Sequence, residues 1–228
     1  NWGRGFPHPS AAERRAAAAS LAALPDATPV LLDGLAAGVL APELSREAGR
    51  LRLVALVHHP LALETGLAAD ARRCLAAAER AALARVAAVV ATSGATAARL
   101  RQSYGVPAER LLVAPPGTDR PPPRRRPRRG PVQLLAVGAV TPRKGHDVLI
   151  AALSRLRAAS WRCTIVGSLT RDPAWAARMQ RLARAHRLGA RLRFAGEVPR
   201  VAPYFAAADL FVLPSRHEGY GMGFAEAP

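Results

Sequence analysis

The run Ser215 to Glu226, SRHEGYGMGFAE, has the residue types most suited to binding a charged ligand, and it follows an apolar stretch typical of a buried strand. Its two carboxylates, Glu218 and Glu226, are separated by seven residues that include three glycines. Glycines let backbone N–H groups approach an anion closely, and a helix that begins near Phe224 would add its positive N-terminal end. Carboxylates on both sides can accept hydrogen bonds from hydroxyl groups. The run therefore indicates a site for a diphosphate that carries a sugar on each side.

Lys144 is the second candidate, because it is the single lysine in a chain with 33 Lys and Arg residues. Lysine presents a compact point charge, whereas arginine presents a planar fork, so a phosphate site is one reason to keep a lysine. A surface cation at the start of a helix is the alternative interpretation. In either case we expect Lys144 on an exposed loop, where its removal would barely affect folding.

The pattern around these residues alternates between strands and helices. Apolar runs predict strands over 29–32, 51–57, 86–92, 111–114, 132–137, 163–166, 191–195 and 209–213. Helical periodicity and capping residues predict helices over 11–24, 67–85, 94–103, 146–158, 174–188 and 201–208. Such alternation is typical of parallel sheets covered by helices, so the expected fold class is α/β with two Rossmann-like domains.

Residues 120–131, RPPPRRRPRRGP, interrupt this alternation. Proline removes backbone donors and clustered arginines repel one another, so neither a helix nor a strand is expected there. We interpret the segment as a linker between an N-terminal domain over 1–119 and a C-terminal domain over 132–228. The alternative is a non-catalytic, basic nucleic-acid-binding α/β protein that uses Arg124 to Arg129.

Several motifs together resemble family 4 glycosyltransferases, which have the GT-B fold. The pair Glu218 and Glu226 resembles the family's E-x7-E signature, and the segment from Val137 to Ile150 resembles its strand–loop–helix with a phosphate-binding lysine. Further segments also resemble the family: 194–198, 208–215, Val57-His58, Ser93 and 116–119.

The resemblance implies a glycosyltransferase of the hexosyltransferase type, which moves a sugar from a nucleotide-diphosphate-sugar to an unidentified acceptor. It implies retention of configuration, no metal and no cofactor besides the donor substrate. The implied catalytic residues are Glu218, Lys144 and His58. The implied donor-binding residues are Gly138, Arg143, Lys144, Val198, Glu218, Gly219, Tyr220, Gly221, Met222, Gly223, Phe224 and Glu226. Among these, Tyr220 and Met222 are expected to pack the loop, and adjacent histidines such as His58 and His59 are often only structural.

The chain departs from the family pattern in three places. Ala139 stands where many members have a second diphosphate-binding arginine, for which Arg143 is a possible substitute, and Gly223 stands where proline or alanine is usual. The glycine-rich loop of the first strand is missing. We therefore expect an internal fragment in which both domains are incomplete and which is inactive alone.

The formal charge of +17 is the main compositional feature. The arginines are scattered, including a helical stripe at Arg178, Arg181, Arg184 and Arg187, so we interpret them as solvated faces and expect no nucleic-acid partner. No apolar run is long enough to span a membrane, although peripheral membrane contact remains compatible. Only Cys74 and Cys163 occur, without metal-ligand spacing, which favours a cytoplasmic setting. The glycine spacing after residue 218 does not fit a dinucleotide-binding dehydrogenase.

Overall fold

The computed structural model of the chain describes residues 8–64, 66–118 and 130–227. Its contacts divide the chain into two compact parts, Asn1–Pro116 and Gly117–Pro228, which we call unit 1 and unit 2. Each unit contains one four-stranded sheet whose neighbouring strands are parallel. The predicted α/β class with two parallel-sheet domains is therefore confirmed.

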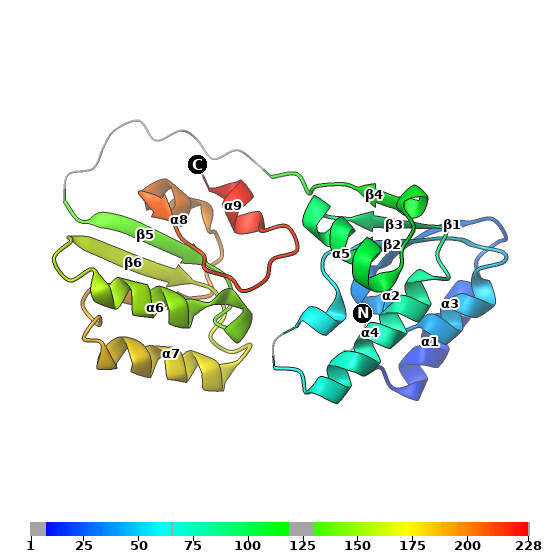
Figure 1. Cartoon of the computed structure of the whole chain (residues 1–228), viewed down its shortest axis with the longest axis horizontal. Helices are drawn as coiled ribbons and strands as arrows, with labels where there is room; N and C mark the ends of the chain where they lie inside the picture. The colour runs from blue at the N-terminus through cyan, green and yellow to red at the C-terminus, as the bar shows by residue number, and fades with distance from the viewer. Residues whose placement is uncertain (1–7, 65, 119–129, 228) are drawn as a thin grey trace. The chain divides into compact units, whose positions relative to one another are not determined.

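Unit 1 alternates strands with helices along the chain (Figure 1). Its strands are β1 (Pro29–Asp33), β2 (Arg52–Val57), β3 (Ala88–Ala91) and β4 (Leu111–Val113), and they lie side by side in this order. Its helices are α1 (Ala11–Ala22), α2 (Gly34–Ala37), α3 (Ala41–Glu47), α4 (Ala69–Leu83) and α5 (Gly94–Tyr104). Two short 3₁₀ turns, η1 (Leu61–Leu63) and η2 (Ala108–Arg110), complete the unit.

The core of unit 1 follows from the two-residue period of its strands, because successive side chains point to opposite faces of a sheet. Leu53, Ala55 and Val57 of β2 are all buried, while the residues between them are partly exposed. Leucines of the helices, including Leu44 of α3 and Leu83 of α4, join the same core. Strand β2 is thereby fixed against the helical layer, and its carboxyl end carries His58.

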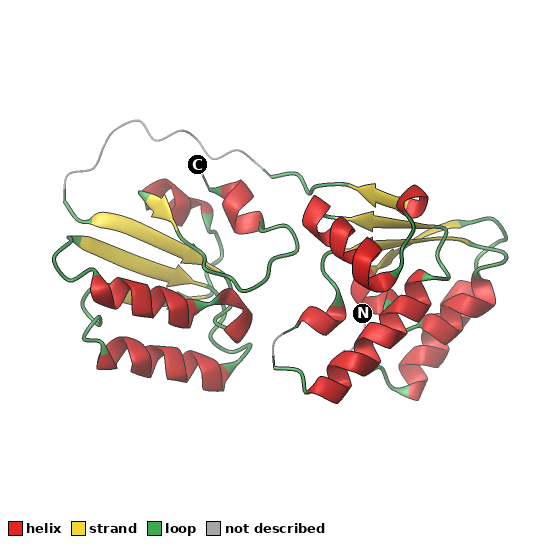
Figure 2. Cartoon of the chain, viewed as in Figure 1, coloured by secondary structure: helices red, strands yellow, loops and turns green. Residues whose placement is uncertain are grey.

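Unit 2 has the same alternation but a different strand order. Its strands are β5 (Val132–Val137), β6 (Trp161–Val166), β7 (Leu192–Gly196) and β8 (Leu210–Phe211), arranged as β7-β6-β5-β8. Its helices are α6 (His146–Arg155), α7 (Pro173–Ala185), α8 (Ala202–Ala207) and α9 (Met222–Glu226), and the 3₁₀ turn η3 (Pro142–Lys144) precedes α6. Figure 2 shows α6 and α7 on one face of the sheet and α8 on the other.

Both faces of the sheet in unit 2 are covered. Ile150 of α6 and Met179 of α7 pack with Ile165 of β6 in one cluster. Phe205 of α8 packs with Leu135 of β5 in a separate cluster. Strands buried on both faces read as continuous apolar runs, which is why β5 and β6 are recognisable in the sequence.

Most predicted elements are present, with shifted ends. The helix expected near Phe224 begins at Met222, and the strand expected over 209–213 is reduced to Leu210–Phe211. Helices α2 and α3 were not expected, because Gly34, Gly38 and Pro42 interrupt the apolar period there. Helix α2 nevertheless forms, since the Asp33 side chain accepts a hydrogen bond from the backbone N–H of Leu35 at 2.8 Å.

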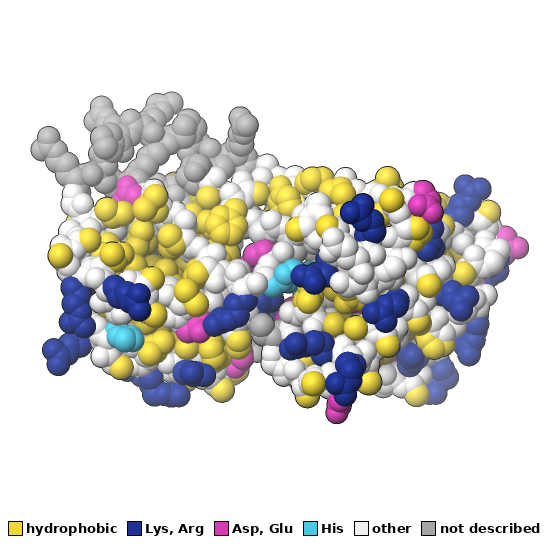
Figure 3. Space-filling view, in the orientation of Figure 1, with side chains coloured by type: hydrophobic (Ala, Val, Ile, Leu, Met, Phe, Trp, Pro, Cys, Tyr) yellow, Lys and Arg dark blue, Asp and Glu magenta, His cyan; other side chains and the backbone are white. Residues whose placement is uncertain are grey.

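The expectation that the arginine stripe is exposed is also met, although α7 ends at Ala185, before Arg187. Arg178, Arg181, Arg184 and Arg187 are all exposed, and Figure 3 shows Lys and Arg side chains spread over the visible face. The proposed linker over 120–131 and its cluster Arg124 to Arg129 lie almost wholly outside the described residues and stay predictions. No helix among the described residues is long and apolar enough to cross a membrane.

Candidate functional site

The sheet of unit 2 changes direction at β5. The chain runs from β5 outward to β6 and β7, then returns to place β8 on the other side of β5. The chain leaves β5 for α6 on one face of the sheet and reaches β8 through α8 on the other face, so the loops that follow β5 and β8 start from neighbouring strands at the same carboxyl edge. Such a switch point is where open α/β sheets bind ligands.

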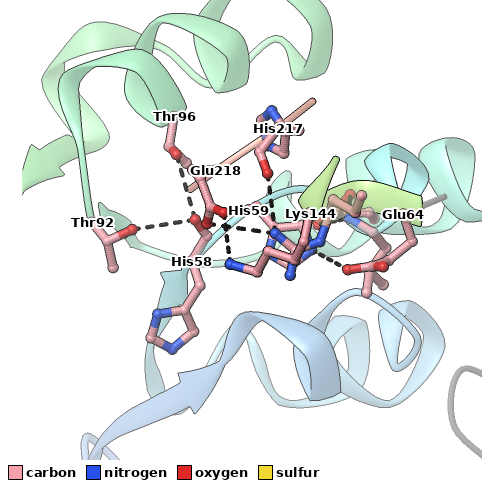
Figure 4. A network of polar contacts seen from close by, with 11 residues as sticks. His58, His59, Glu64, Thr92, Thr96, Lys144, His217 and Glu218 are labelled. Carbon is pink, nitrogen blue, oxygen red and sulfur yellow. Dashed lines mark hydrogen bonds and ion pairs between the residues drawn. The ribbon is translucent and has the colours of Figure 1, made fainter. Parts of the chain in front are cut away.

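Lys144 and Glu218 come from these two loops and meet directly. Lys144 Nζ donates a hydrogen bond to Glu218 Oε1 at 2.6 Å, a contact drawn in Figure 4. Ser215 Oγ donates to the same oxygen at 2.5 Å, and Arg143 Nη1 lies 3.6 Å from Glu218 Oε2. The side chains of Lys144 and Glu218 are only 16% and 20% exposed, so the expectation that Lys144 is an exposed loop cation is wrong. Its alkyl stem lies over Gly138, where an added Cβ would be 3.1 Å from Lys144 Cε.

The charge state of Glu218 follows from these neighbours. Burial acts to raise the pKa of Glu218, but the hydrogen bonds from Lys144 and Ser215 and the charges of Lys144 and Arg143 lower it below its ordinary value. The carboxylate is therefore ionised at neutral pH and can accept hydrogen bonds. The site thus holds an anionic acceptor beside a cationic donor.

The two loops approach each other closely along their length. An added Cβ at Gly145 would lie 1.9 Å from the carbonyl oxygen of Pro214, and Gly145 has a φ of +67°. Arg143 Nη1 donates to the carbonyl oxygen of His217 at 3.1 Å, and Arg216 N–H donates to the carbonyl oxygen of Arg143 at 2.8 Å. Only glycine allows this approach, so Gly145 is required for the contact between the two loops, and the sequence interpretation did not single it out.

The glycine-rich run after Glu218 turns into α9. Gly221 has a φ of +87° and its carbonyl oxygen accepts from Phe224 N–H at 2.8 Å. The Phe224 ring packs edge-on against Phe211, with ring centroids 5.1 Å apart. Tyr220 and Met222 are 38% and 40% exposed, so the expectation that they pack the loop is wrong.

The other residues predicted to bind the sugar donor take no part in the hydrogen bond between Lys144 and Glu218. Val198 follows β7 and packs partly buried beside the cluster of Phe205. Glu226 ends α9, and within the described part of the chain no hydrogen bond or ion pair involves its carboxylate. Gly219 and Gly223 lie in the same run, and Gly223 leaves room for the Phe211 ring, since an added Cβ would be 2.7 Å from Phe211 Cζ.

Unit 1 carries the predicted residue His58 directly after β2. Its Nε2 lies 3.6 Å from Oδ2 of Asp33, which ends the neighbouring strand β1. Its backbone carbonyl accepts from the hydroxyls of Thr92 and Thr96 at 3.2 and 3.4 Å (Figure 4). Both threonines are buried, so the backbone of His58 is held by the fold while its side chain stays half exposed.

A buried carboxylate supports the segment that follows His58. Glu79 of α4 is 1% exposed and accepts from Leu61 N–H through both oxygens, at 3.3 and 3.1 Å. Burial raises the pKa of Glu79 to about 7, although hydrogen bonds from Tyr104 and Leu61 act to lower it. His59 Nε2 lies 2.7 Å from Glu64 Oε1. No sequence signal marks Glu79 as buried, because a glutamate in an Ala-rich helix usually faces solvent.

His146, the first residue of α6, is fully buried, and neither ring nitrogen has a hydrogen-bond partner in the described part of the structure. Burial, with the charge of Lys144 as a smaller cause, lowers the pKa of His146 to about 4. Among residues 8–64, 66–118 and 130–227, no group of three or more His, Cys, Asp or Glu side chains is placed to hold a metal ion.

The two-unit arrangement of parallel sheets is the GT-B glycosyltransferase fold. The chain matches sucrose-phosphate synthase from Thermosynechococcus elongatus with a TM-score of 0.72 and 23% identity over 92% of this chain and 55% of that one. It matches HepE from Anabaena, solved with UDP and glucose, with a TM-score of 0.68 and 21% identity over 86% of this chain and 56% of that one.

The chain belongs to the glycosyltransferases of family 4, group 1. Residues 6–120 match the profile described as Glycosyltransferase Family 4, and residues 121–228 match Glycosyl transferases group 1. A D-inositol 3-phosphate glycosyltransferase from Xylanimonas cellulosilytica is 33% identical over 61% of this chain, and a glycogen synthase from Mycobacterium tuberculosis is 38% identical over 45%. The chain spans 38% and 25% of the lengths of these two relatives.

Proposed function

We propose that the chain binds a nucleotide-diphosphate-sugar and takes part in the transfer of its sugar to an acceptor that is not identified. The observation that carries the proposal is the 2.6 Å contact between Lys144 and Glu218 at the switch point of unit 2. It joins a cation suited to a diphosphate with a carboxylate suited to sugar hydroxyls. The structures of HepE with UDP and with UDP-glucose support this class of ligand.

The chemistry asked of Lys144 is electrostatic. Transfer breaks the bond between the sugar and the diphosphate, forms a bond to an acceptor oxygen and releases the proton of the acceptor hydroxyl. Negative charge grows on the leaving diphosphate, and a preorganised cation stabilises that charge. An ammonium group has three N–H donors, so Lys144 can bind phosphate oxygens while one donor stays on Glu218.

The remaining assignments extend the proposal. Arg143 and Lys144 supply the positive charge that a metal ion would otherwise bring, which supports a metal-independent reaction. Retention rests on the family resemblance, as do the roles of His58 and Val198. Glu226 would accept a hydrogen bond from the ribose of the donor, a role that rests on the same resemblance. A hexosyl donor is supported by the glycogen synthase and by a mannosyltransferase, LpcC from Rhizobium leguminosarum, that is 32% identical over 40% of this chain.

A cytoplasmic setting is supported by Cys74 and Cys163, both free thiols.

The experiment that tests the proposal is a binding panel on the 228-residue chain. UDP, GDP and ADP and their sugar conjugates are titrated by calorimetry, with and without EDTA. We expect at least one nucleotide to bind, unaffected by EDTA. Lys144→Ala should weaken that binding about 10- to 150-fold, because it removes a charge-assisted contact of about 1.5–3 kcal/mol. Lys144→Arg should recover only part of the loss.

The control is Arg181→Ala on α7, an exposed arginine of the same unit, which should bind like the wild type. Because Lys144 is mostly buried and paired, we also expect Lys144→Ala to destabilise unit 2 by about 1–2 kcal/mol, in contrast to the sequence-based expectation of almost no effect. Ala139→Arg should partly rescue binding in Lys144→Ala. Unchanged affinity in Lys144→Ala, with a nucleotide that does bind, would contradict the proposal.

A further inference from the structure

A second ion pair ties the same two loops together, and the proposed function does not use it. Arg216 Nη1 and Nη2 donate to Asp147 Oδ1 and Oδ2 at 2.9 and 2.6 Å. Nη1 also donates to the carbonyl oxygen of Pro142 at 2.6 Å, and the Arg216 N–H donates to the carbonyl oxygen of Arg143 at 2.8 Å. Arg216 therefore contacts the β5 loop on both sides of Lys144.

The geometry of the Arg216–Asp147 ion pair suits the alignment of the two loops better than the stabilisation of the fold. The side chains of Arg216 and Asp147 are 44% and 27% exposed, and ion pairs at such exposure add little to stability. Two parallel N–H to oxygen contacts do, however, fix the orientation of both side chains. The hydrogen bonds from Arg216 lower the pKa of Asp147, so the carboxylate stays ionised at neutral pH.

We propose that Arg216 and Asp147 are a positioning pair that sets the register between the Lys144 loop and the Glu218 loop. Arg216 lies two residues before Glu218, and Asp147 lies three residues after Lys144. A bidentate contact between them fixes how far one loop can slide along the other. The pair thereby fixes where the Lys144 ammonium is held at the edge of the sheet, and its role in ligand binding rests on the proposed function.

The test measures the affinity of the full chain for the nucleoside diphosphate that binds best in the panel above. Arg216→Ala should weaken binding about tenfold, the effect of losing one charge-assisted contact. Arg216→Lys should be nearly as weak, because an ammonium group cannot make the bidentate contact and reach Pro142 together. The charge-swapped double variant Arg216→Asp with Asp147→Arg should recover part of the affinity. Arg181→Ala is the matched control and should bind normally.

A double-mutant cycle separates positioning from a general structural role. If Arg216 acts through Lys144, the variant that combines Arg216→Ala with Lys144→Ala should bind no more weakly than Lys144→Ala alone. If the two losses multiply, Arg216 acts independently of Lys144 and the positioning role is overturned. Wild-type affinity in Arg216→Ala would overturn it as well.

Hydrogen exchange keeps the proposal testable if no nucleotide binds. Absence of binding by the wild type contradicts the proposed function, whereas loop alignment is read from the amides of residues 143–147 and 215–221. These amides should exchange faster in Arg216→Ala than in Arg181→Ala, while those of α7 should be unchanged. Equal exchange in the two variants would overturn the positioning role of Arg216 and Asp147.

Discussion

The two sheets of this chain are built from the same parallel units but differ in strand order. In unit 1 the described strands run β1-β2-β3-β4 without a reversal, whereas unit 2 reverses at β5 to give β7-β6-β5-β8. At the reversal, two loops more than 70 residues apart in the chain meet and exchange side-chain contacts, as Lys144 and Glu218 do. In unit 1 the polar contacts around His58 instead hold backbone groups, such as the His58 carbonyl oxygen, which accepts a hydrogen bond from the Thr92 hydroxyl. Strand order thus decides where two loops can build one charged site.

The strongest test of this difference is Gly145→Ala. An alanine Cβ there would lie 1.9 Å from the Pro214 carbonyl oxygen, at a φ of +67°. Overpacking together with a left-handed alanine should cost about 2–5 kcal/mol in the free energy of unfolding. Urea denaturation followed by the fluorescence of Trp161 and Trp175 measures the loss.

Gly189→Ala in the same unit is the control for that measurement. No atom lies within 4 Å of its added Cβ, so the substitution should change stability by less than about 0.5 kcal/mol. If Gly145→Ala were equally mild, the two loops could separate freely, and the close approach would not be a property of the switch point.

Acid should affect the two units in opposite directions. Glu79 in unit 1 has a pKa raised from 4.5 to about 7, so its protonated form is favoured in the folded state. The stabilisation that protonated Glu79 gives to the folded unit is complete below pH 4.5 and is lost as the pH rises through 7. The loss amounts to about 3 kcal/mol in the free energy of unfolding. His146 in unit 2 has a pKa lowered from 6.5 to about 4. Its contribution is complete above pH 6.5 and is lost as pH falls through 4, again by about 3 kcal/mol.

Native-state hydrogen exchange reads this contrast for each unit separately, through amides of β2 and of β6. Between pH 7 and 5, protection corrected for intrinsic rates should rise in unit 1 and fall in unit 2. Glu79→Gln should remove the first trend and His146→Gln the second. Trends of the same sign in both units, or trends that survive these substitutions, would contradict the assignment of these buried groups.

The charge of Glu218 can be tested against its neighbour Lys144. Glu218→Gln removes a negative charge beside the proposed diphosphate site and frees the ammonium of Lys144. Free nucleoside diphosphate should then bind about fivefold more tightly, corresponding to about 1 kcal/mol of like-charge repulsion. The preference for the sugar conjugate over the free diphosphate should fall, because an amide accepts hydroxyl hydrogen bonds less strongly than a carboxylate. Calorimetry on both ligands gives the ratio.

Glu109→Gln provides the control for this effect, since Glu109 is an exposed glutamate of unit 1 and is not among the residues proposed to bind the donor. It should leave both affinities and their ratio unchanged. Weaker binding of the free diphosphate to Glu218→Gln would mean that Glu218 supports the anion indirectly, through the placement of Lys144.

The proximity of Lys144 and Glu218 could be predicted from the sequence, because both follow predicted strands of one parallel sheet and the carboxyl ends of such strands lie at the same edge. Sequence reasoning did not find Arg216 with Asp147, since a contact between loops depends on how far each loop extends beyond its strand. It also missed Glu79 and His146, which have polar side chains at positions where only tertiary packing decides burial. Helix α2 was not predicted because its start depends on Asp33 as the N-cap, and aspartate is common in turns as well as at helix N-caps.

The smallest expected effects belong to the polar cluster of unit 1. Asp33→Asn and His58→Ala alter a contact of 3.6 Å between half-exposed side chains, so each should change the free energy of unfolding by less than about 1 kcal/mol. Both should leave the affinity for a free nucleoside diphosphate unchanged, because the residues proposed to bind it all belong to unit 2. If His58 faces the transferred sugar, His58→Ala should lower turnover of a sugar donor while the Kd of the free diphosphate stays constant. Calorimetry and a donor-turnover assay on the same preparations measure the two quantities. A loss of diphosphate affinity in His58→Ala would break the comparison, since a residue after β2 would then share the task assigned to the switch point of β5 and β8.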